Sequence, residues 1–227
     1  MHTEKKPDTR LLSALPYLTD GGVVADIGTD HAYLPIELIR RGLARRAIAC
    51  DINEGPIETA RRHIAEAGLS HVIDTLRTDG LCGVETYRPT DVLIFGMGGE
   101  LIARILADAP WVREEKTNLI LQPMSKGEVL CRWLLENGFA VLHESLTYEG
   151  QYYRTIHARA GEKCERYTEA ELYLGKYGNL KGSPLLEGYL QRKQAVLERA
   201  AEGKRKGGQP TDYEEGILAE LRENWRR

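Results

Sequence analysis

The sequence is poor in residues that cross-link proteins or bind metals. It has 4 cysteines among 227 residues, and no two of them stand in the C-x-x-C spacing of zinc or redox sites. We therefore expect reduced, buried thiols at Cys50, Cys82, Cys131 and Cys164. The histidines show no metal-ligand spacing either. This pattern argues against a disulfide-stapled scaffold and predicts no metal site.

Long hydrophobic runs are also missing. The longest, such as residues 92–95 and 119–121, are far shorter than the about 20 residues that cross a bilayer. The first five residues lack the apolar segment of a signal peptide. We therefore expect a cytoplasmic protein with no membrane partner, and we take it to be a monomer.

An excess of basic charge, which would point directly to a nucleic-acid partner, is absent. There are 31 Lys and Arg residues against 34 Asp and Glu residues, a net charge of -3. The acidic excess lies in residues 1–160, whereas residues 161–227 are close to neutral. Basic residues gather locally at Arg40-Arg41, Arg45-Arg46, Arg61-Arg62, Arg192-Lys193 and Lys204-Arg205-Lys206. A binding patch for RNA therefore stays open.

Up to about residue 160, apolar β-rich runs alternate with helical patterns, which predicts a parallel sheet with crossover helices. The expected strands are 23–27, 47–51, 72–77, 91–95, 118–122, 139–147 and 152–158, and the expected helices are 8–18, 33–41, 54–67, 99–106 and 127–136. Glu149-Gly150 predicts a tight hairpin between the last two strands. A closing antiparallel hairpin is the usual end of a class I methyltransferase sheet. We therefore expect an α/β, Rossmann-like methyltransferase sheet of seven strands rather than a plain dinucleotide-binding fold.

After about residue 160 the strand-like runs stop. Helical patterns cover 167–177, the stretch after Ser183-Pro184 and the final residues 217–225, with a turn at 203–210. We therefore divide the chain into 1–160 and a small α-helical, coiled-coil-like domain at 161–227. Two helices of this size do not fold well alone, so this domain is expected to dock or oligomerise.

Ligands of open parallel sheets bind at the carboxyl ends of the strands, and several residues there suit an adenosine cofactor. Gly28 permits a tight turn. Asp51 can accept hydrogen bonds from both hydroxyls of a ribose, and Asp79 can accept one from the exocyclic amine of adenine. The predicted cofactor-binding residues are Asp26, Gly28, Asp51, Ile52, Asp79, Gly80, Gly96, Met97 and Gly98.

The first loop favours S-adenosyl-L-methionine (AdoMet) over NAD. Asp30 and Ala32 replace the second and third glycines of a dinucleotide loop, and a carboxylate beside a pyrophosphate would repel it. AdoMet has no phosphate, and its ammonium and sulfonium groups tolerate a carboxylate nearby. The sequence therefore predicts AdoMet, with S-adenosyl-L-homocysteine as product.

Several motifs resemble the bacterial tRNA (adenine-22-N1)-methyltransferases. They are Asp26-Ile-Gly-Thr-Asp-His-Ala-Tyr-Leu-Pro35, Ile94-Phe-Gly-Met-Gly-Gly-Glu100, Leu121-Gln-Pro-Met124 and Tyr152-Tyr-Arg-Thr-Ile156. The resemblance implies AdoMet as donor and N1 of adenosine 22, in the D-arm region of tRNA, as acceptor. It also implies a C-terminal coiled-coil-like domain that assists tRNA binding. By position, it assigns Gly28 to the cofactor loop, Asp51 to the ribose and Asp79 to the adenine.

The acceptor side fits a ring nitrogen better than an exocyclic amine. Gly96-Met-Gly-Gly99 carries no acceptor side chain, whereas enzymes that methylate amines often have Asn/Asp-Pro-Pro-Phe/Tyr there. N1 of adenine has an in-plane lone pair and needs alignment more than deprotonation. N1 also lies on the Watson–Crick edge, so the adenosine must be unpaired or extruded.

The predicted catalytic residues are Asp30, His31 and Tyr33. Asp30 would place a carboxylate near the edge of the target adenine, and His31 would position that base or shuttle a proton. Tyr33 would stack on the base. A loop-capping role for His31 and sheet packing for Tyr33 are the simpler readings. The predicted substrate-binding residues are Gly99, Glu100, Gln122 and Pro123.

Three other functions stay open. An NAD-dependent oxidoreductase or epimerase requires a glycine-rich pyrophosphate turn, which Asp30 contradicts. A non-catalytic RNA-binding module would have lost the acidic cofactor residues, yet Asp26, Asp51 and Asp79 are present. A methyltransferase that acts on another RNA, a protein or a small molecule predicts no salt-sensitive tRNA binding.

Overall fold

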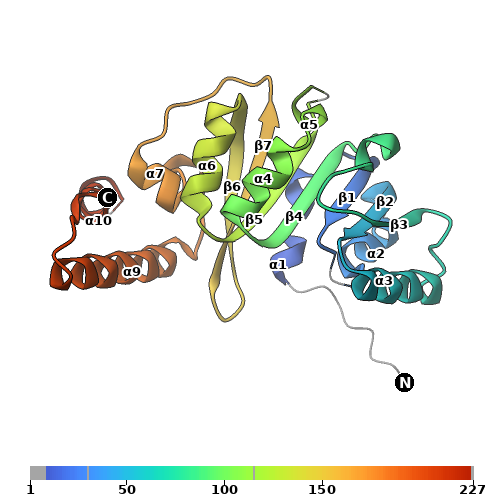
Figure 1. Cartoon of the computed structure of the whole chain (residues 1–227), viewed down its shortest axis with the longest axis horizontal. Helices are drawn as coiled ribbons and strands as arrows, with labels where there is room; N and C mark the ends of the chain where they lie inside the picture. Colours follow the sequence, from blue (N-terminus) through green and yellow to red (C-terminus); the bar gives the residue numbers. More distant parts are fainter. Residues whose placement is uncertain (1–8, 30, 115, 226–227) are drawn as a thin grey trace.

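A computed structural model describes residues 9–29, 31–114 and 116–225. Its strands are β1 (Gly22–Ile27), β2 (Ala44–Asp51), β3 (Ile73–Arg77), β4 (Asp91–Gly98), β5 (Asn118–Ser125), β6 (Phe139–Tyr148) and β7 (Tyr152–Ala160). They form one 7-stranded sheet in the order β3-β2-β1-β4-β5-β7-β6 (Figure 1). The pairs among β1 to β5 are parallel, and β7 runs antiparallel to both β5 and β6. The expected methyltransferase topology with its closing hairpin is confirmed.

Helices cover both faces of the sheet. Around the sheet lie α1 (Thr9–Leu12), η1 (Leu15–Tyr17), α2 (Tyr33–Arg40), α3 (Glu54–Glu66), η2 (Val84–Tyr87), α4 (Gly99–Ala107), α5 (Trp111–Glu114) and α6 (Gly127–Glu136). Helices α4 and α6 pack on one face, and α1, α2 and α3 pack on the other. A sheet covered on both sides needs nearly continuous apolar strands, which is why Val92 to Phe95 is buried throughout.

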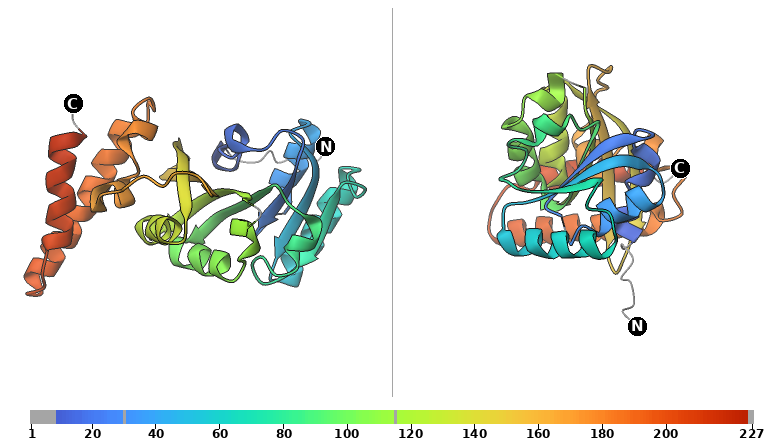
Figure 2. Two further views of the ribbon diagram at one scale, coloured as in Figure 1. Left: turned by 90° about the horizontal axis from the view of Figure 1, so that it is seen from above. Right: turned by 90° about the vertical axis from the view of Figure 1, so that its right-hand side faces the viewer.

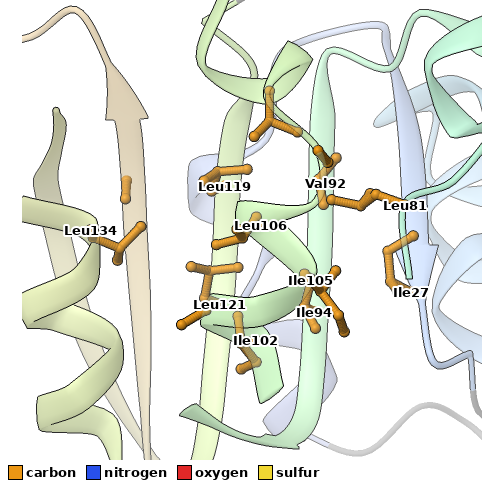
Figure 3. Packing of buried hydrophobic residues seen from close by; sticks show 14 of the residues in the cluster. Ile27, Leu81, Val92, Ile94, Ile102, Ile105, Leu106, Leu119, Leu121 and Leu134 are labelled. Atoms are coloured by element: carbon orange, nitrogen blue, oxygen red, sulfur yellow. The ribbon is translucent and has the colours of Figure 1, made fainter. Parts of the chain in front are cut away.

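The core beneath α4 shows how this side is held. Figure 3 shows Ile102, Ile105 and Leu106 of α4 turned toward the sheet, against Val92 and Ile94 of β4 and Leu119 and Leu121 of β5. Because residues alternate faces along a strand, Leu93 and Phe95 point the other way, into the cluster formed with α1 and α2. This packing fixes the ends of β1, β4 and β5 relative to one another.

The C-terminal region consists of α7 (Glu169–Leu174), α8 (Tyr177–Leu180), α9 (Leu186–Lys206) and α10 (Asp212–Asn224). In Figure 1, α9 lies across the view and α10 is seen nearly end-on, so the two helices cross rather than run side by side. The left view of Figure 2 shows these helices beyond β6, at one end of the sheet. The expected helical region is therefore present.

Helix α9 packs directly against the closing hairpin. A side chain at Gly188 would overlap the Tyr152 hydroxyl, so the helix backbone needs a glycine at this contact. Tyr152 lies at the start of β7, near the hairpin tip.

Several predicted boundaries are wrong for identifiable reasons. Pro123 does not end β5, because it sits where the pairing with β4 shifts register and no regular ladder bond is needed. The helix expected over 167–177 is broken at Gly175, which has φ +92°. Helix α9 runs through Gly203 to Lys206, so the expected turn begins later. The expected helix over 8–18 is split into α1 and η1.

The prediction that all four cysteine side chains are buried holds for two of them. Cys50 and Cys131 are buried, whereas Cys82 and Cys164 are exposed, and all four are free thiols. Within the residues described, no helix is both long and apolar enough to cross a membrane.

A buried ion pair joins the hairpin to the C-terminal helices. Arg154 of β7 lies 3.5 Å from Glu144 of β6, and their side chains are 6% and 0% exposed. Arg154 also donates to the carbonyl of Leu172 at 3.2 Å and to Cys131 Sγ at 3.0 Å. Glu144 accepts from the backbone N–H of Lys176 at 2.7 Å. Four elements thus share one buried charge pair.

We predict that Arg154→Met strongly destabilises the protein, because it leaves the Glu144 carboxylate buried without its counter-charge. The expected loss is about 3–5 kcal/mol in the free energy of unfolding, measured by urea denaturation. The matched control is Arg132→Met, which removes an exposed ion pair to Glu169 and should cost about 0–1 kcal/mol. Equal losses for the two variants would contradict the prediction.

A cluster of stacked rings attaches η1 to the sheet. Tyr17 stacks on His157 with ring centroids 5.2 Å apart, and on His143 at 5.9 Å. Burial, and secondarily the charges of His143 and Arg159, lower the pKa of His157 from 6.5 to about 4. His157 is therefore neutral in the folded protein at neutral pH.

We predict acid-sensitive stability from His157. Between pH 6.5 and 4 the unfolded chain binds a proton that the folded protein does not, so stability falls as the pH is lowered through this range. The loss from this group is at most about 3 kcal/mol. His157→Phe, which keeps the ring stack, should flatten the pH dependence in denaturation experiments, whereas exposed His71→Gln should not.

Candidate functional site

The loop after β1 is hydrogen-bonded to the end of β2. The backbone N–H groups of Gly28 and Thr29 both donate to the carbonyl of Cys50, at 2.8 and 2.9 Å. Gly28 has φ +74°, and a side chain there would overlap Met97 at the end of β4. The positive φ favours glycine, and the methyl group of the Met97 side chain packs against Gly28 between the ends of β1 and β4.

Asp26 lies at the base of this crevice. It is 6% exposed, and its Oδ2 accepts a hydrogen bond of 2.6 Å from the Thr29 hydroxyl. A cavity of about 210 Å³ opens beside it, and its lining residues are Arg10, Leu11, Asp26, Gly28, Leu34, Phe95 and Gly96. The predicted residues Asp26, Gly28 and Gly96 therefore meet in one cavity.

The pKa of the neighbouring Cys50 thiol reflects the charges around the end of β2. Burial raises the pKa of its thiol well above the usual range, and the carboxylates of Asp26 and Asp51 raise it further. Cys50 is thus a neutral packing residue, and the edge of the sheet beside it is acidic. This field suits a ligand that carries positive charge.

Asp51 and Asp79 follow adjacent strands. The Asp51 carbonyl accepts from Thr78 N–H at 2.9 Å, which ties the two strand ends together. Both side-chain hydrogen bonds described for Asp51, from the backbone and side chain of Asn53, use Oδ1, at 2.7 and 3.2 Å. Asp79 is exposed, and the adjacent Ile52 is 54% exposed. The exposed isoleucine, which follows Asp51 in the sequence, offers an apolar surface to an aromatic ring.

These residues fit AdoMet. Gly28 has the positive φ expected of a cofactor loop, and Asp51 and Asp79, the residues predicted to contact the ribose and the adenine, lie at the ends of the neighbouring strands β2 and β3. Gly80 is held at φ +57° close to Ile105, which fixes the turn that presents Asp79. Within the described ranges, no group of three His, Cys, Asp or Glu side chains could hold a metal ion.

The segment after the first loop is strained. His31 and Ala32 have φ of 60° and 59°, a conformation that costs energy for residues other than glycine. His63 of α3 braces them, with its Nδ1 lying 3.0 Å from the His31 carbonyl oxygen. The Tyr33 ring stacks on His63 at 5.3 Å and lies 5.5 Å from the His31 ring. Asp30, the predicted catalytic carboxylate, lies outside the described residues.

The predicted substrate-binding residues differ in accessibility. Glu100 is exposed at the start of α4, and Pro123 is half-buried. Gly99 is buried, and a side chain there would overlap the Lys126 carbonyl, so packing alone requires this glycine. Gln122 is fully buried beneath Arg10, whose Nη1 donates to its Oε1 at 3.3 Å.

Sequence reasoning missed two residues of this region. Arg10 precedes the first strand and carries no local motif, so only the fold brings it to the cavity. His63 lies on the helix after β2, and only its spatial contact with His31 reveals its position. No sequence signal pointed to either residue.

Comparisons with known proteins identify the family of the chain. Residues 8–156 match the family described as "Methyltransferase domain". The chain is 35% identical over 173 residues to the tRNA (adenine(22)-N(1))-methyltransferase of Bacillus subtilis, covering 76% of this chain and 73% of that protein.

Solved structures extend the similarity to the C-terminal helices. The structure of the B. subtilis m1A22 tRNA methyltransferase TrmK superposes with a TM-score of 0.80 at 27% identity, covering 95% of this chain and 94% of that one. M. capricolum TrmK, solved with S-adenosyl-homocysteine, gives a TM-score of 0.77 at 27% identity, covering 87% and 88%. The chain belongs to the tRNA (adenine(22)-N(1))-methyltransferase family.

Proposed function

We propose that this protein transfers the methyl group of AdoMet to N1 of adenosine 22 in the D-arm region of bacterial tRNA and releases S-adenosyl-L-homocysteine. The observation that carries the proposal is membership of the family, together with carboxylates at Asp26, Asp51 and Asp79 that suit a cofactor without phosphate. We place the reaction in the cytoplasm.

When bound, AdoMet supplies an electrophilic methyl group on a sulfonium. The chain's task is to hold that cofactor in one orientation. Asp51 binds the ribose hydroxyls, and Asp79 accepts a hydrogen bond from the adenine amine. Ile52 packs on the adenine ring. The backbone of Gly28 and the residues Gly96 to Gly98 shape the cradle between β1 and β4.

On the acceptor side, the residues align a base that is already nucleophilic. Gly96-Met97-Gly98 offers no side chain that would accept an amine proton, which matches attack by the N1 lone pair. His31 and Tyr33 lie beside the cradle on a strained segment braced by His63, a conformation that pre-organises their rings. We assign the base-stacking role to Tyr33, base positioning or proton transfer to His31, and stabilisation of the cationic product to Asp30. Glu100 and Pro123 border the acceptor side.

The C-terminal helices assist tRNA binding in this proposal, as a second domain at residues 161–227. Helix α9 lies beside the hairpin tip, and Arg192 and Arg199 are exposed on it. Its basic end is less available, because Lys204 and Arg205 form ion pairs with Glu214 and Glu215. Exposed arginines next to the active edge suit an RNA backbone.

The reaction itself is tested with unmodified tRNA transcripts and labelled AdoMet. We predict one methyl group per tRNA, recovered as 1-methyladenosine at position 22 when nuclease fragments are mapped by mass spectrometry. A transcript with A22 replaced by G serves as control and should take up no label. Label at another nucleoside, or transfer only to a protein or small molecule, would overturn the proposal.

The cofactor assignment is tested separately by calorimetry with S-adenosyl-L-homocysteine. Asp51→Ala should weaken binding at least about 100-fold, because it removes a charged acceptor from two hydroxyl groups. Asp51→Asn keeps an acceptor for Asn53 and should still lose most of the affinity. Asp74→Ala, at an exposed aspartate of the neighbouring β3, should bind like the parent protein. Unchanged affinity in both Asp51 variants would refute the ribose role.

A further inference from the structure

A second pocket opens at the amino-terminal edge of the sheet, far from the cofactor crevice. Its volume is about 290 Å³, and it surrounds Thr90 and Asn118, where β4 and β5 begin. Gly96, which lines the crevice, lies six residues beyond Thr90, and six strand residues at about 3.3 Å each span about 20 Å. Figure 1 shows this separation, with α5 and the end of β7 at the top and the hairpin tip at the bottom. This amino-edge pocket is therefore distinct from the proposed AdoMet site.

Three cationic side chains from separate segments line the amino-edge pocket. They are Arg88 after η2, Lys116 before β5 and Arg159 near the end of β7. Arg159 shares its charge with Glu162 in an ion pair. Within the part of the chain that the structure describes, no carboxylate pairs with Arg88 or Lys116. The pocket therefore has positive charge that the protein itself does not neutralise.

Three other lining residues bind a buried carboxylate behind them. Asp91 is completely buried, and its Oδ1 accepts from the backbone N–H and the hydroxyl of Thr19 at 2.9 and 3.1 Å and from Asn118 Nδ2 at 3.1 Å. Its Oδ2 accepts from the Thr90 hydroxyl at 2.6 Å. Four donors satisfy this carboxylate, so it does not need the three cations as hydrogen-bond partners.

Thr117 adds an unused hydroxyl to the same wall. The residue is 3% exposed, and among the described residues its Oγ1 has no hydrogen-bond partner. A buried hydroxyl without a partner is destabilising, and a ligand that accepts its hydrogen removes that cost. Rotation about the Cα–Cβ bond breaks no hydrogen bond, so the hydroxyl is free to turn toward such a ligand.

Two of the cations stand on strained backbone. Arg88 and Lys116 have φ of 49° and 53°, a conformation that residues other than glycine disfavour. The stem of Lys116 also lies against Gly161, where a side-chain carbon would come within 3.0 Å of Lys116 Cε and 3.4 Å of its Nζ. Glycine at either turn would relieve the strain, and the cations are present in spite of it.

This combination of donors fits a phosphate group. Its oxygens can accept together from a guanidinium, an ammonium and a hydroxyl. RNA backbones are bound instead by cations spread over a face or along a stripe, whereas these cations converge on one concave pocket. A compact ligand with a single phosphate group therefore matches the pocket better than a polymer.

We propose that the amino-edge pocket binds the phosphate group of a small molecule, through its three cations and the Thr117 hydroxyl. The proposal adds a second ligand site to the protein and does not depend on the proposed function.

The test uses inorganic phosphate as probe and thermal unfolding of the full chain at constant ionic strength as readout. The melting temperature should rise and saturate, because a ligand that binds only the folded state stabilises it by mass action. The general solvent effect of phosphate does not saturate. Saturating S-adenosyl-L-homocysteine should leave the apparent phosphate affinity unchanged. Absence of a saturable rise, or competition between the two ligands, would overturn the proposal.

Arg88→Met combined with Lys116→Met removes two charges and keeps both aliphatic stems. The double variant should weaken phosphate binding at least about tenfold. Arg45→Met combined with Lys181→Met, at two exposed cations outside the pocket, makes the same change in net charge and should bind phosphate like the parent protein. Equal weakening in both pairs would show an effect of net charge alone and contradict the site.

The same double variants separate a small ligand from RNA. In filter-binding titrations with tRNA, the Arg88 and Lys116 pair should bind as tightly as the parent protein. A loss of tRNA affinity with unchanged phosphate affinity would assign these cations to the RNA backbone and overturn the proposal.

Thr117→Val keeps the shape of the side chain and removes the hydroxyl. It should weaken phosphate binding several-fold without lowering the melting temperature in phosphate-free buffer, because no hydrogen bond is lost in the free protein. Unchanged phosphate affinity would exclude this hydroxyl from the site. A lower melting temperature without phosphate, at unchanged affinity, would give it a structural role only.

Discussion

The buried pair of Arg154 and Glu144 is the interaction on which the arrangement of the two halves depends. The hairpin supplies both charges, and the C-terminal helices supply the backbone groups that complete their hydrogen bonds. Neither half satisfies these charges without the other, because an isolated charge in an apolar core is strongly destabilising. Leu172 of α7 also belongs to the main core beneath the sheet. The helices are therefore anchored to the sheet rather than tethered by a linker.

The carboxyl edge of the sheet is organised differently. Here a cavity for a ligand opens between the ends of β1 and β4. The methyl group of Met97 packs against Gly28, so the Met97 side chain lies between the ends of β1 and β4. Asp26, Asp51 and Asp79 lie at or after the ends of the neighbouring strands β1, β2 and β3, and the exposed Ile52 follows Asp51. A ligand with a cationic centre and a neutral ring system matches that sequence of environments, whereas a pyrophosphate does not.

Much of this was predictable from local pattern. The strand ends that carry Asp26, Asp51 and Asp79 follow from apolar runs broken by glycine, and the hairpin follows from Glu149-Gly150. Arg10 and His63 were not predictable, because each acts only through a residue distant in sequence. Gln122 was predicted as a substrate-binding residue, but its complete burial could not be read from its position at a strand end. The basic run at residues 204–206 illustrates the same limit, since its ion pairs with α10 appear only in the fold.

The contact between Gly188 and Tyr152 has a geometric consequence. Because the backbone of α9 rests directly on the Tyr152 side chain of the hairpin, the helix has little freedom to slide or roll against the sheet. The distance from α9 to the crevice is therefore fixed. An RNA that touches both must present its target base at a set distance from a second, remote backbone segment. If the C-terminal helices bind tRNA as proposed, the enzyme would select its substrate by three-dimensional shape, and a short oligonucleotide would not reach both ends.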